Sequence, residues 1–354
     1  MSINQGKVDA DLFQAQAHLY RHVLNYLTSM CLKSAMQLNI PDIIHSHGRP
    51  ITLPELLSAL HIDPAKSSYL YRLMRLLVHS GFFSTTKGDG EEVRFDLTPS
   101  SKILLKDNIP SLASHAQLLL HPVMVHSSES LGDWFRSNEP TPFHTAHEVG
   151  LWEYISQNQE FNRFFNESMI GDSSMMALLI KDCKSVFEGF DTLVDVGGGN
   201  GSVARILSES LPNLQCIVLD LPHVVENLQD SGNLKFIGGD MLQYIPPADS
   251  FLFKLVLHCF SDEQCVKVLK MCREAIASKG KEGKVMIIDI VINEEKDEAD
   301  MKDAKLFFDA VMLAAMAGKE REEKEWEKLF LEAGFSHYKI TPIFGFRSMI
   351  EVYP

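Results

Sequence analysis

A cluster of glycines follows a short apolar run in the second half of the chain. The segment LVDVGGGNGSVARIL, residues 193–207, places these glycines between the apolar run and a helix-like run. Gly197, Gly199 and Gly201 have the spacing G-x-G-x-G, and Ser202 stands where a dinucleotide-binding loop would have its third glycine. Glycine lets a ligand approach the main chain closely. The segment therefore predicts a ligand-binding turn that differs from the dinucleotide loop.

Acidic residues at the ends of neighbouring apolar runs narrow the choice of ligand. Asp220 ends the next run, Asp240 ends the one after it, and Asp195 lies beside the glycines. The loop holds no Lys or Arg for a phosphate, and Arg205 is the nearest cation. Taken singly, each acid could be a solvated loop residue or a helix cap. Together they favour S-adenosylmethionine, which has a ribose, a sulfonium and an ammonium group but no phosphate.

The elements that must position these residues are short apolar runs at fairly even spacing after residue 190. These runs are TLVDVG, LQCIVLD, LKFIGGD, SFLFKLVL and KVMIIDIVI, and helix-like stretches separate several of them. Such alternation predicts an α/β fold, with a mostly parallel sheet covered by helices on both faces. Ligands of these sheets bind at the carboxyl ends of the strands. Residues 110–190 read as mostly helical, with a loop at 138–150.

The N-terminal part of the chain reads as a separate helical domain. Residues 10–48 read as helix with apolar residues on more than one face, which predicts packing against either a second copy or the other domain. Thr52 and Glu55 have capping-box spacing. A second helix at 65–80 and two strand-like runs around the Gly-Asp-Gly turn at 88–90 complete a winged-helix pattern.

A winged helix raises the question of DNA binding. The second helix carries three basic side chains, Lys66, Arg72 and Arg75, whereas the wing carries three acids, Asp89, Glu91 and Glu92. The net charge of the chain is −14, which opposes binding to nucleic acid or to an anionic membrane. We therefore expect a scaffold that only shares the winged-helix shape.

Length and composition indicate the number of domains and the cellular location of the protein. The chain has 354 residues, of which 45% are hydrophobic, and this length suggests two domains. We expect a helical winged-helix dimerisation domain at 1–112 and a cofactor domain at 113–354, with a helical substrate-binding segment at 113–190. The chain shows no apolar run of 18 residues, no signal-peptide pattern and no CxxC pair among its six cysteines. These features predict a cytoplasmic protein with free thiols.

Several motifs resemble a known family. IPDIIHSHG, DVGGGNG, LDLPHV, GGDM, LHCFSDEQC and GKERE resemble the plant S-adenosylmethionine-dependent O-methyltransferases of the caffeic acid, isoflavone and stilbene type, over nearly the whole chain. The resemblance implies a Rossmann-like cofactor domain and an N-terminal domain that forms a homodimer. It also implies cofactor contacts at Gly197, Asp220, Asp240, Met241 and Lys254. The product of the cofactor would be S-adenosylhomocysteine.

The same resemblance places a catalytic base at His258, directly after the run FLFKLVL. A phenol has a pKa of about 10, so a histidine that accepts its proton near neutral pH is a suitable base. Asp289 and Glu320 would flank the histidine, fix its tautomer and stabilise its charged form. We expect no metal to be required. The chain has Cys259 and Phe260 in the sequence HCF, where the family usually has HDW or HNW.

The acceptor is expected to be a multi-ring phenol, such as a flavonoid, isoflavonoid, stilbene or lignan. Phe165, Met169 and Met312 match substrate-contact positions of the family, and Met316 lies one helical turn after Met312. Methionine adapts to flat aromatic rings, although ordinary core packing is an equal alternative for each residue. Two other functions stay open: methylation of an alkaloid phenol or amine, and a winged-helix ligand sensor without catalysis.

Overall fold

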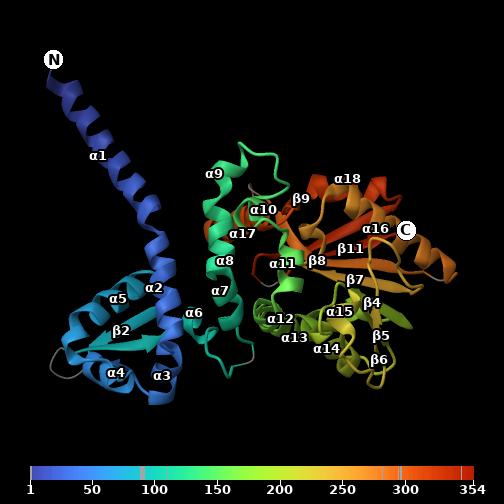
Figure 1. The fold of residues 1–354 in the computed structure, drawn as a ribbon, viewed down its shortest axis with the longest axis horizontal. Coiled ribbons are helices and arrows are strands. Elements are labelled where there is room, and N and C mark those ends of the chain that lie inside the picture. The colour runs from blue at the N-terminus through green and yellow to red at the C-terminus, as the bar shows by residue number, and fades with distance from the viewer. Residues whose placement is uncertain are drawn as a thin grey trace. The chain divides into compact units, whose positions relative to one another are not determined.

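The structure of the chain is a computed structural model that describes residues 2–87, 92–108, 110–280, 282–293, 295, 297–343 and 345–354. The chain divides into two units, residues 1–120 and residues 121–354 (Figure 1). Each unit builds its own elements and core. Among the described residues, no helix has the length and apolar character needed to cross a membrane.

The first unit begins with three helices where the sequence predicted a single one. They are α1 (Ser2–Leu24), α2 (Tyr26–Gln37) and α3 (Ile40–His47). Asn39 adopts a left-handed conformation with φ 56°, which ends one helix, and Pro41 lies in the first turn of the next. Asn tolerates this conformation because its short polar side chain can bond locally. The prediction of one helix over 10–48 was therefore wrong, because apolar periodicity does not report such breaks.

The rest of the first unit has the predicted helix–helix–hairpin order. Its elements are β1 (Ile51–Thr52), α4 (Leu53–Ala59), the 3-10 turn η1 (Pro64–Lys66), α5 (Ser67–His79), β2 (Phe83–Lys87), β3 (Val93–Leu97), α6 (Pro99–Lys102) and α7 (Ala113–Leu119). The capping box of Thr52 and Glu55 is confirmed at the start of α4. The sheet has the order β1-β3-β2. Glu92 is exposed, whereas the predicted turn at 88–90, with Asp89, and Glu91 lie outside the described residues.

The second unit opens with helices and includes one that the sequence did not predict. The elements are α8 (Pro122–Glu129), α9 (Leu131–Trp134), α10 (Pro142–His147), α11 (Leu151–Gln157), α12 (Gln159–Ser174), α13 (Met176–Cys183) and the 3-10 turn η2 (Lys184–Phe187). The expected loop at 138–150 was partly wrong, because it contains α10. Thr141 caps this helix by accepting from the His144 backbone N–H, and Pro142 lies in its first turn.

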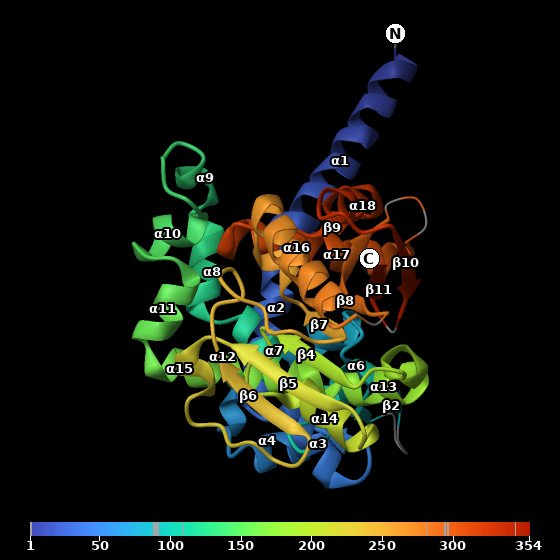
Figure 2. The same cartoon turned by 90° about the vertical axis from the view of Figure 1, so that its right-hand side faces the viewer.

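A mixed sheet forms the centre of the second unit (Figure 2). Its strands are β4 (Thr192–Val196), β5 (Gln215–Asp220), β6 (Leu234–Gly238), β7 (Ser250–Lys254), β8 (Lys284–Ile292), β9 (Arg321–Glu322), β10 (His337–Pro342) and β11 (Arg347–Tyr353). The order is β10-β11-β8-β7-β4-β5-β6, and β9 pairs with β8. The strands β4 to β8 run parallel, whereas β10 and β11 are antiparallel. All five predicted apolar runs are confirmed as strands.

Alternating side chains of the strands build one core on each face of this sheet. Val194, Phe251 and Ile287 pack on one face with residues of α16 (Asp262–Ser278) and α18 (Glu323–Glu332). Leu252 and Met286 pack on the other with residues of α13 and α14 (Ser202–Ser210). Neighbouring residues of a strand point to opposite faces, so continuous apolar runs match a sheet that is covered on both sides. The remaining elements are α15 (Pro222–Val225), the 3-10 turn η3 (Leu257–Cys259) and α17 (Ala299–Ala315).

Candidate active site

His258 lies directly beyond the carboxyl end of β7, in the short turn η3. Leu255, between the strand and this turn, has φ 53°, and its N–H donates to the carbonyl of Ile288. A left-handed Leu is a strained conformation that persists only where the surroundings enforce it. The chain therefore turns sharply after β7 and carries His258 into the interior, where it is 6% exposed.

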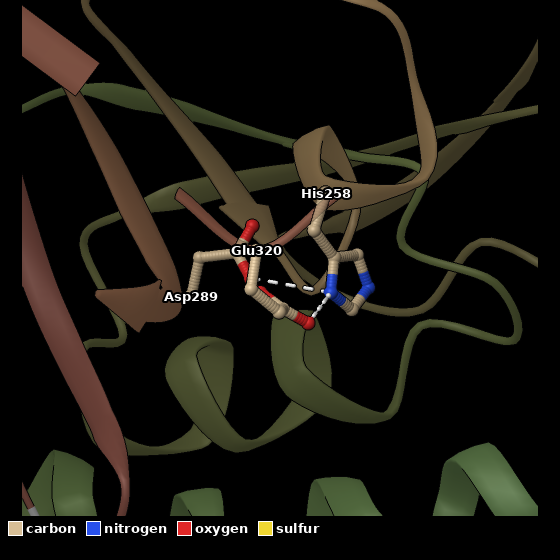
Figure 3. A group of neighbouring side chains, drawn as sticks. All are labelled: His258, Asp289 and Glu320. Carbon is tan, nitrogen blue, oxygen red and sulfur yellow. Dashed lines mark hydrogen bonds and ion pairs between the residues drawn. The ribbon is translucent and has the colours of Figure 1, made fainter. Parts of the chain in front are cut away.

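Two carboxylates face one nitrogen of the His258 ring. Nδ1 lies 2.7 Å from Oε1 of Glu320 and 3.4 Å from Oδ1 of Asp289. Figure 3 shows the other ring nitrogen pointing away from both acids. Asp289 lies in β8, the strand beside β7, and Glu320 directly precedes β9. Neighbouring strands thus bring together all three proposed catalytic residues, which are separated by up to 62 positions.

The surrounding charges favour a proton on this group. Burial alone would lower the pKa of His258, but the charge of Asp289 and the neighbouring Cys259 and Glu320 side chains hold it well above its ordinary value of 6.5. Burial raises the pKa of Glu320 to about 7, against the lowering effect of His258. Nδ1 lies within hydrogen-bond distance of Glu320, and an ionised carboxylate can only accept, so Nδ1 is the donor when Glu320 is ionised.

The same three side chains offer a possible set of metal ligands. One atom each from His258, Asp289 and Glu320 lies within 4.8 Å of the others, and all three residues are buried. One imidazole nitrogen and two carboxylate oxygens suit several divalent ions. The 2.7 Å contact of His258 with Glu320, however, is a hydrogen bond, and an ion at Nδ1 would have to replace its proton.

The predicted cofactor loop is a tight turn after β4. Gly197 has φ 69°, and an added Cβ would lie 2.9 Å from Cγ2 of Val256, so only glycine fits there. Asp220, at the end of β5, accepts from the N–H of Gly199 and from that of Leu221, both at 2.7 Å. Burial raises the pKa of Asp220. These bonds fix the Asp220 carboxylate against the glycine loop.

Asp240 and Met241 follow β6 along the chain. Asp240 accepts from the Leu242 N–H at 2.8 Å and from Nε2 of Gln243 at 2.9 Å. Met241 is partly buried and packs on the core of the α16 face. The structure thus places Asp220 and Asp240 after adjacent strands of one sheet edge, as the sequence predicted.

Lys254, the fifth proposed cofactor contact, belongs to a buried ionic network. Its Nζ lies 2.6 Å from Oδ2 of Asp172 in α12, and Oδ1 of Asp172 pairs with Arg347 in β11. Burial lowers the pKa of Lys254, while Asp172 opposes this shift. Burial also raises the pKa of Asp195 to about 7, and its Oδ2 has no hydrogen-bond partner among the described residues. This edge of the sheet therefore holds several buried ionisable side chains.

Three of the four proposed acceptor contacts lie on helices. Met316 was expected to lie one turn after Met312 on the same helix, but that expectation was wrong, because α17 ends at Ala315 and the backbone of Met316 is extended. Phe165 and Met169 are one turn apart on α12 and partly buried, and Phe165 meets Trp152 edge-on with ring centroids 5.9 Å apart. Met312 is buried near the end of α17, and Met316 follows that helix directly. The structure leaves these pairs on separate elements.

Three charged residues near the site were missed by sequence reasoning. The first is Asp172, which pairs with both Lys254 and Arg347. The second is Asp309, which accepts from the N–H of Glu320 at 2.9 Å. The third is Arg321, which is fully buried. Glu320 and Arg321 stand in the charged run GKEREEKEWEK, which reads as a solvated surface. The buried Trp326 in the same run was the available signal that one side faces the core.

Known proteins of similar sequence define the family. Residues 128–336 match the O-methyltransferase domain, and residues 20–107 match the O-methyltransferase dimerisation domain. The chain is 48% identical to a trans-resveratrol di-O-methyltransferase of Vitis vinifera, with all of both chains covered. It is 50% identical to an isoflavone 4'-O-methyltransferase of Lotus japonicus, covering 100% of this chain and 99% of the relative. The chain therefore belongs to the O-methyltransferase family.

Solved structures agree with this fold. The chain resembles CalO1, a methyltransferase of calicheamicin biosynthesis solved with S-adenosylhomocysteine bound, at a TM-score of 0.80 and 26% identity over 96% of this chain and 98% of the other. Human N-acetylserotonin methyltransferase, solved with S-adenosylmethionine, gives a TM-score of 0.78 at 19% identity over 96% of this chain and 97% of the other. The predicted Rossmann-like fold with a mostly helical N-terminal region is confirmed.

Proposed function

We propose that this O-methyltransferase moves the methyl group of S-adenosylmethionine to a phenolic hydroxyl of a multi-ring plant specialised metabolite. The observation that carries the proposal is the buried His258, with Nδ1 held by Glu320 and Asp289 and the opposite ring nitrogen directed away from them. Two relatives are named as methyltransferases of a stilbene and of an isoflavone, and these names support a multi-ring phenol as the acceptor.

The residues at the glycine loop fit the proposed cofactor. Asp220 uses one lone pair of each oxygen for a backbone N–H, so each oxygen can still accept from a ribose hydroxyl. Burial disfavours the charged form of Asp195 and Asp220 and raises the pKa of both, and a positively charged ligand beside them would offset that cost. Gly197, Asp240, Met241 and Lys254 are the further proposed contacts. When bound, S-adenosylmethionine supplies a methyl group on a positively charged sulfur.

His258 would act as the general base. Its outward nitrogen, Nε2, accepts the phenol proton while the phenol oxygen takes the methyl group. The bound cofactor would supply the methyl group, and the electron pair of its C–S bond would stay on sulfur in S-adenosylhomocysteine. The positive charge that forms on His258 is stabilised by Glu320 and Asp289. In this mechanism no metal takes part.

The domains would divide these tasks. We assign dimerisation to residues 1–112 and methyl transfer to 113–354, with the helices of 113–190 contributing acceptor contacts. The match to a dimerisation domain supports a homodimer. The described cysteines are free, which suits a reducing cytoplasm.

The acceptor should be largely apolar. The proposed contacts Phe165, Met169, Met312 and Met316 offer no cation to pair a carboxylate. Burying an unpaired carboxylate costs several kcal/mol, whereas flat rings gain from contact with Met and Phe. Free caffeic acid should therefore be a poorer substrate than a stilbene or isoflavone phenol.

A competition assay tests this assignment. The wild-type protein is incubated with methyl-labelled S-adenosylmethionine and equal concentrations of free caffeic acid, trans-resveratrol, an isoflavone and an aromatic amine. We expect label on the oxygen of a multi-ring phenol. A higher kcat/KM for caffeic acid would contradict the proposed pocket, and label on the amine alone would contradict phenol methylation.

A further inference from the structure

The segment that carries Glu320 is pressed against the turn that carries His258. An added Cβ on Gly318 would lie 1.9 Å from the carbonyl oxygen of His258 and 2.6 Å from the carbonyl carbon of Cys259. No side chain fits at that distance, so the two backbones are in direct contact. The approach of Glu320 to His258 thus depends on how these two backbone segments are held together.

Arg321 makes the bonds that hold them. Nη1 donates to the carbonyl of Leu257 at 3.1 Å, and Nη2 donates to that of Phe260 at 2.9 Å. Nε and Nη2 donate to Oδ1 of Asp262 at 3.0 and 2.8 Å. One guanidinium therefore bonds both sides of His258 and the first residue of α16.

The guanidinium of Arg321 is also held by burial and by contact with Trp326. Arg321 is 0% exposed, and its guanidinium carbon lies 5.3 Å from the centroid of the Trp326 ring. In the backbone register of β9 and β8, Arg321 pairs with Val291, two residues beyond Asp289. The strand that carries Asp289 and the residue that follows Glu320 are thus joined to the turn of His258.

We infer that Arg321 is a positioning residue that aims His258 at the acceptor by locking the turn 257–260 onto Glu320. The inference rests on the proposed function, because it concerns the same base. Arg321 does not touch the reacting atoms. A planar fork with five N–H donors can reach three acceptors at fixed angles, and a lysine cannot.

Two variants test the inference. Arg321→Lys keeps the buried charge but loses the fork, and Gly318→Ala forces the backbones apart while it leaves every charge in place. A misplacement of about 1 Å can cost roughly 100-fold in rate, so we expect each variant to lower kcat roughly 10- to 100-fold. The acceptor KM and the cofactor Kd should change by less than about twofold, because binding is not the affected step.

Lys319→Gln is the matched control. Lys319 also approaches Asp262, at 3.8 Å, but its side chain is 41% exposed and bonds Glu325. Its loss removes a charge from the same loop without touching the turn of His258, and kcat should stay near the wild-type value. A folded Arg321→Lys protein with wild-type kcat, or one that loses cofactor affinity as strongly as rate, would overturn the inference.

A second readout does not depend on activity. In protein labelled with ¹⁵N-histidine, the ring signals of His258 are assigned by their loss in His258→Gln. Arg321→Lys and Gly318→Ala should shift the Nδ1 signal, because its bond to Glu320 weakens, whereas Lys319→Gln should not. An unchanged Nδ1 signal in both variants refutes the positioning role. A wild type that methylates no acceptor refutes the proposed function and leaves this spectral test intact.

Discussion

Two backbone N–H groups fix the carboxylate of Asp220. The N–H groups of Gly199 and Leu221 donate to its two oxygens and hold the carboxylate beside the glycine loop at 197–201. A ribose would therefore meet a carboxylate that needs no reorientation, which lowers the entropic cost of binding. The sequence predicted the place of Asp220 from the end of an apolar run, but not the bonds that fix it.

Replacing Asp220 with Ala should weaken cofactor binding. A hydrogen bond to a charged group contributes about 1.5–3 kcal/mol, which corresponds to roughly 10- to 100-fold in Kd. Calorimetric titration with S-adenosylmethionine measures the effect, and Glu226→Ala, an exposed acid nearby, is the control. Equal affinity of Asp220→Ala and wild type for S-adenosylmethionine would show that Asp220 does not contribute to cofactor binding.

The carboxylates around His258 should set the pH dependence of the reaction. In the proposed mechanism the base is the neutral imidazole, and the raised pKa of His258 moves that form to higher pH. The kcat/KM of the wild type should therefore increase as pH rises above neutrality. Glu320→Gln removes one negative charge, so the His258 pKa should fall and the rising limb should move to lower pH.

The maximal rate of Glu320→Gln should also fall, by about tenfold or more, since the charged imidazole loses a stabilising partner. Steady-state rates across a pH series give both quantities. Glu325→Gln changes a nearby acid whose side chain is 40% exposed, and its profile should match the wild type. If the rising limb of kcat/KM against pH lies at the same pH in Glu320→Gln as in wild type, Glu320 does not affect the pKa of His258.

At the scale of elements, the buried ionic network joins α12 to two strands of the sheet. Asp172 in α12 bonds both Lys254 of β7 and Arg347 of β11. The side chains of Lys254 and Arg347 are only 7% and 11% exposed, so neither can turn to water if Asp172 is lost. The helix that carries Phe165 and Met169 is therefore anchored by charge pairing.

Asp172→Ala should strongly destabilise the second unit. Removing one partner of a buried pair costs about 3–5 kcal/mol, because an uncompensated charge stays behind. The exposed pair of Lys328 and Glu332 provides the control, since Glu332→Ala should cost at most about 1 kcal/mol. Denaturant unfolding followed by fluorescence compares the two. Equal midpoints for both variants would mean that the network does not anchor α12.

The helices and strands show which parts of the fold can be predicted from sequence patterns. All five apolar runs became strands because a sheet covered on both faces requires uninterrupted apolar sequence. The breaks around Asn39 and the helix α10 were missed, because one depends on a left-handed residue and the other on a Thr141 cap inside a loop-like stretch. Arg321 was missed because its burial follows from tertiary contacts, which a charged run does not reveal.

At the scale of the whole molecule, the first helices carry apolar side chains that the single chain leaves in water. They include Leu12, Phe13, Leu19, Tyr20, Val23 and Tyr26, each at least 54% exposed. Large apolar side chains that recur at helical spacing and stay exposed indicate an interaction site. With the matched dimerisation domain at residues 20–107, these helices support assembly with a second copy.

Light scattering should give about twice the 39.9 kDa mass of one chain. Phe13→Glu with Leu19→Glu should reduce this mass to that of one chain, because each places a charge in the apolar surface. Gln14→Glu adds a charge on the opposite face of the same helix, where the side chain is polar and exposed, and should leave the dimer intact. A wild type that has the mass of one chain at micromolar concentration would contradict the homodimer.

In the proposed mechanism His258 performs the transfer as a base without a metal. The most direct measurement is transfer of a labelled methyl group from S-adenosylmethionine to trans-resveratrol or an isoflavone by wild type and His258→Gln, each with and without EDTA. We predict that His258→Gln lowers kcat by about 10²- to 10⁴-fold, that its cofactor Kd by calorimetry matches the wild type, and that EDTA leaves the wild type active. Loss of wild-type activity in EDTA with recovery in magnesium, or a His258→Gln variant as fast as wild type, would contradict the claim.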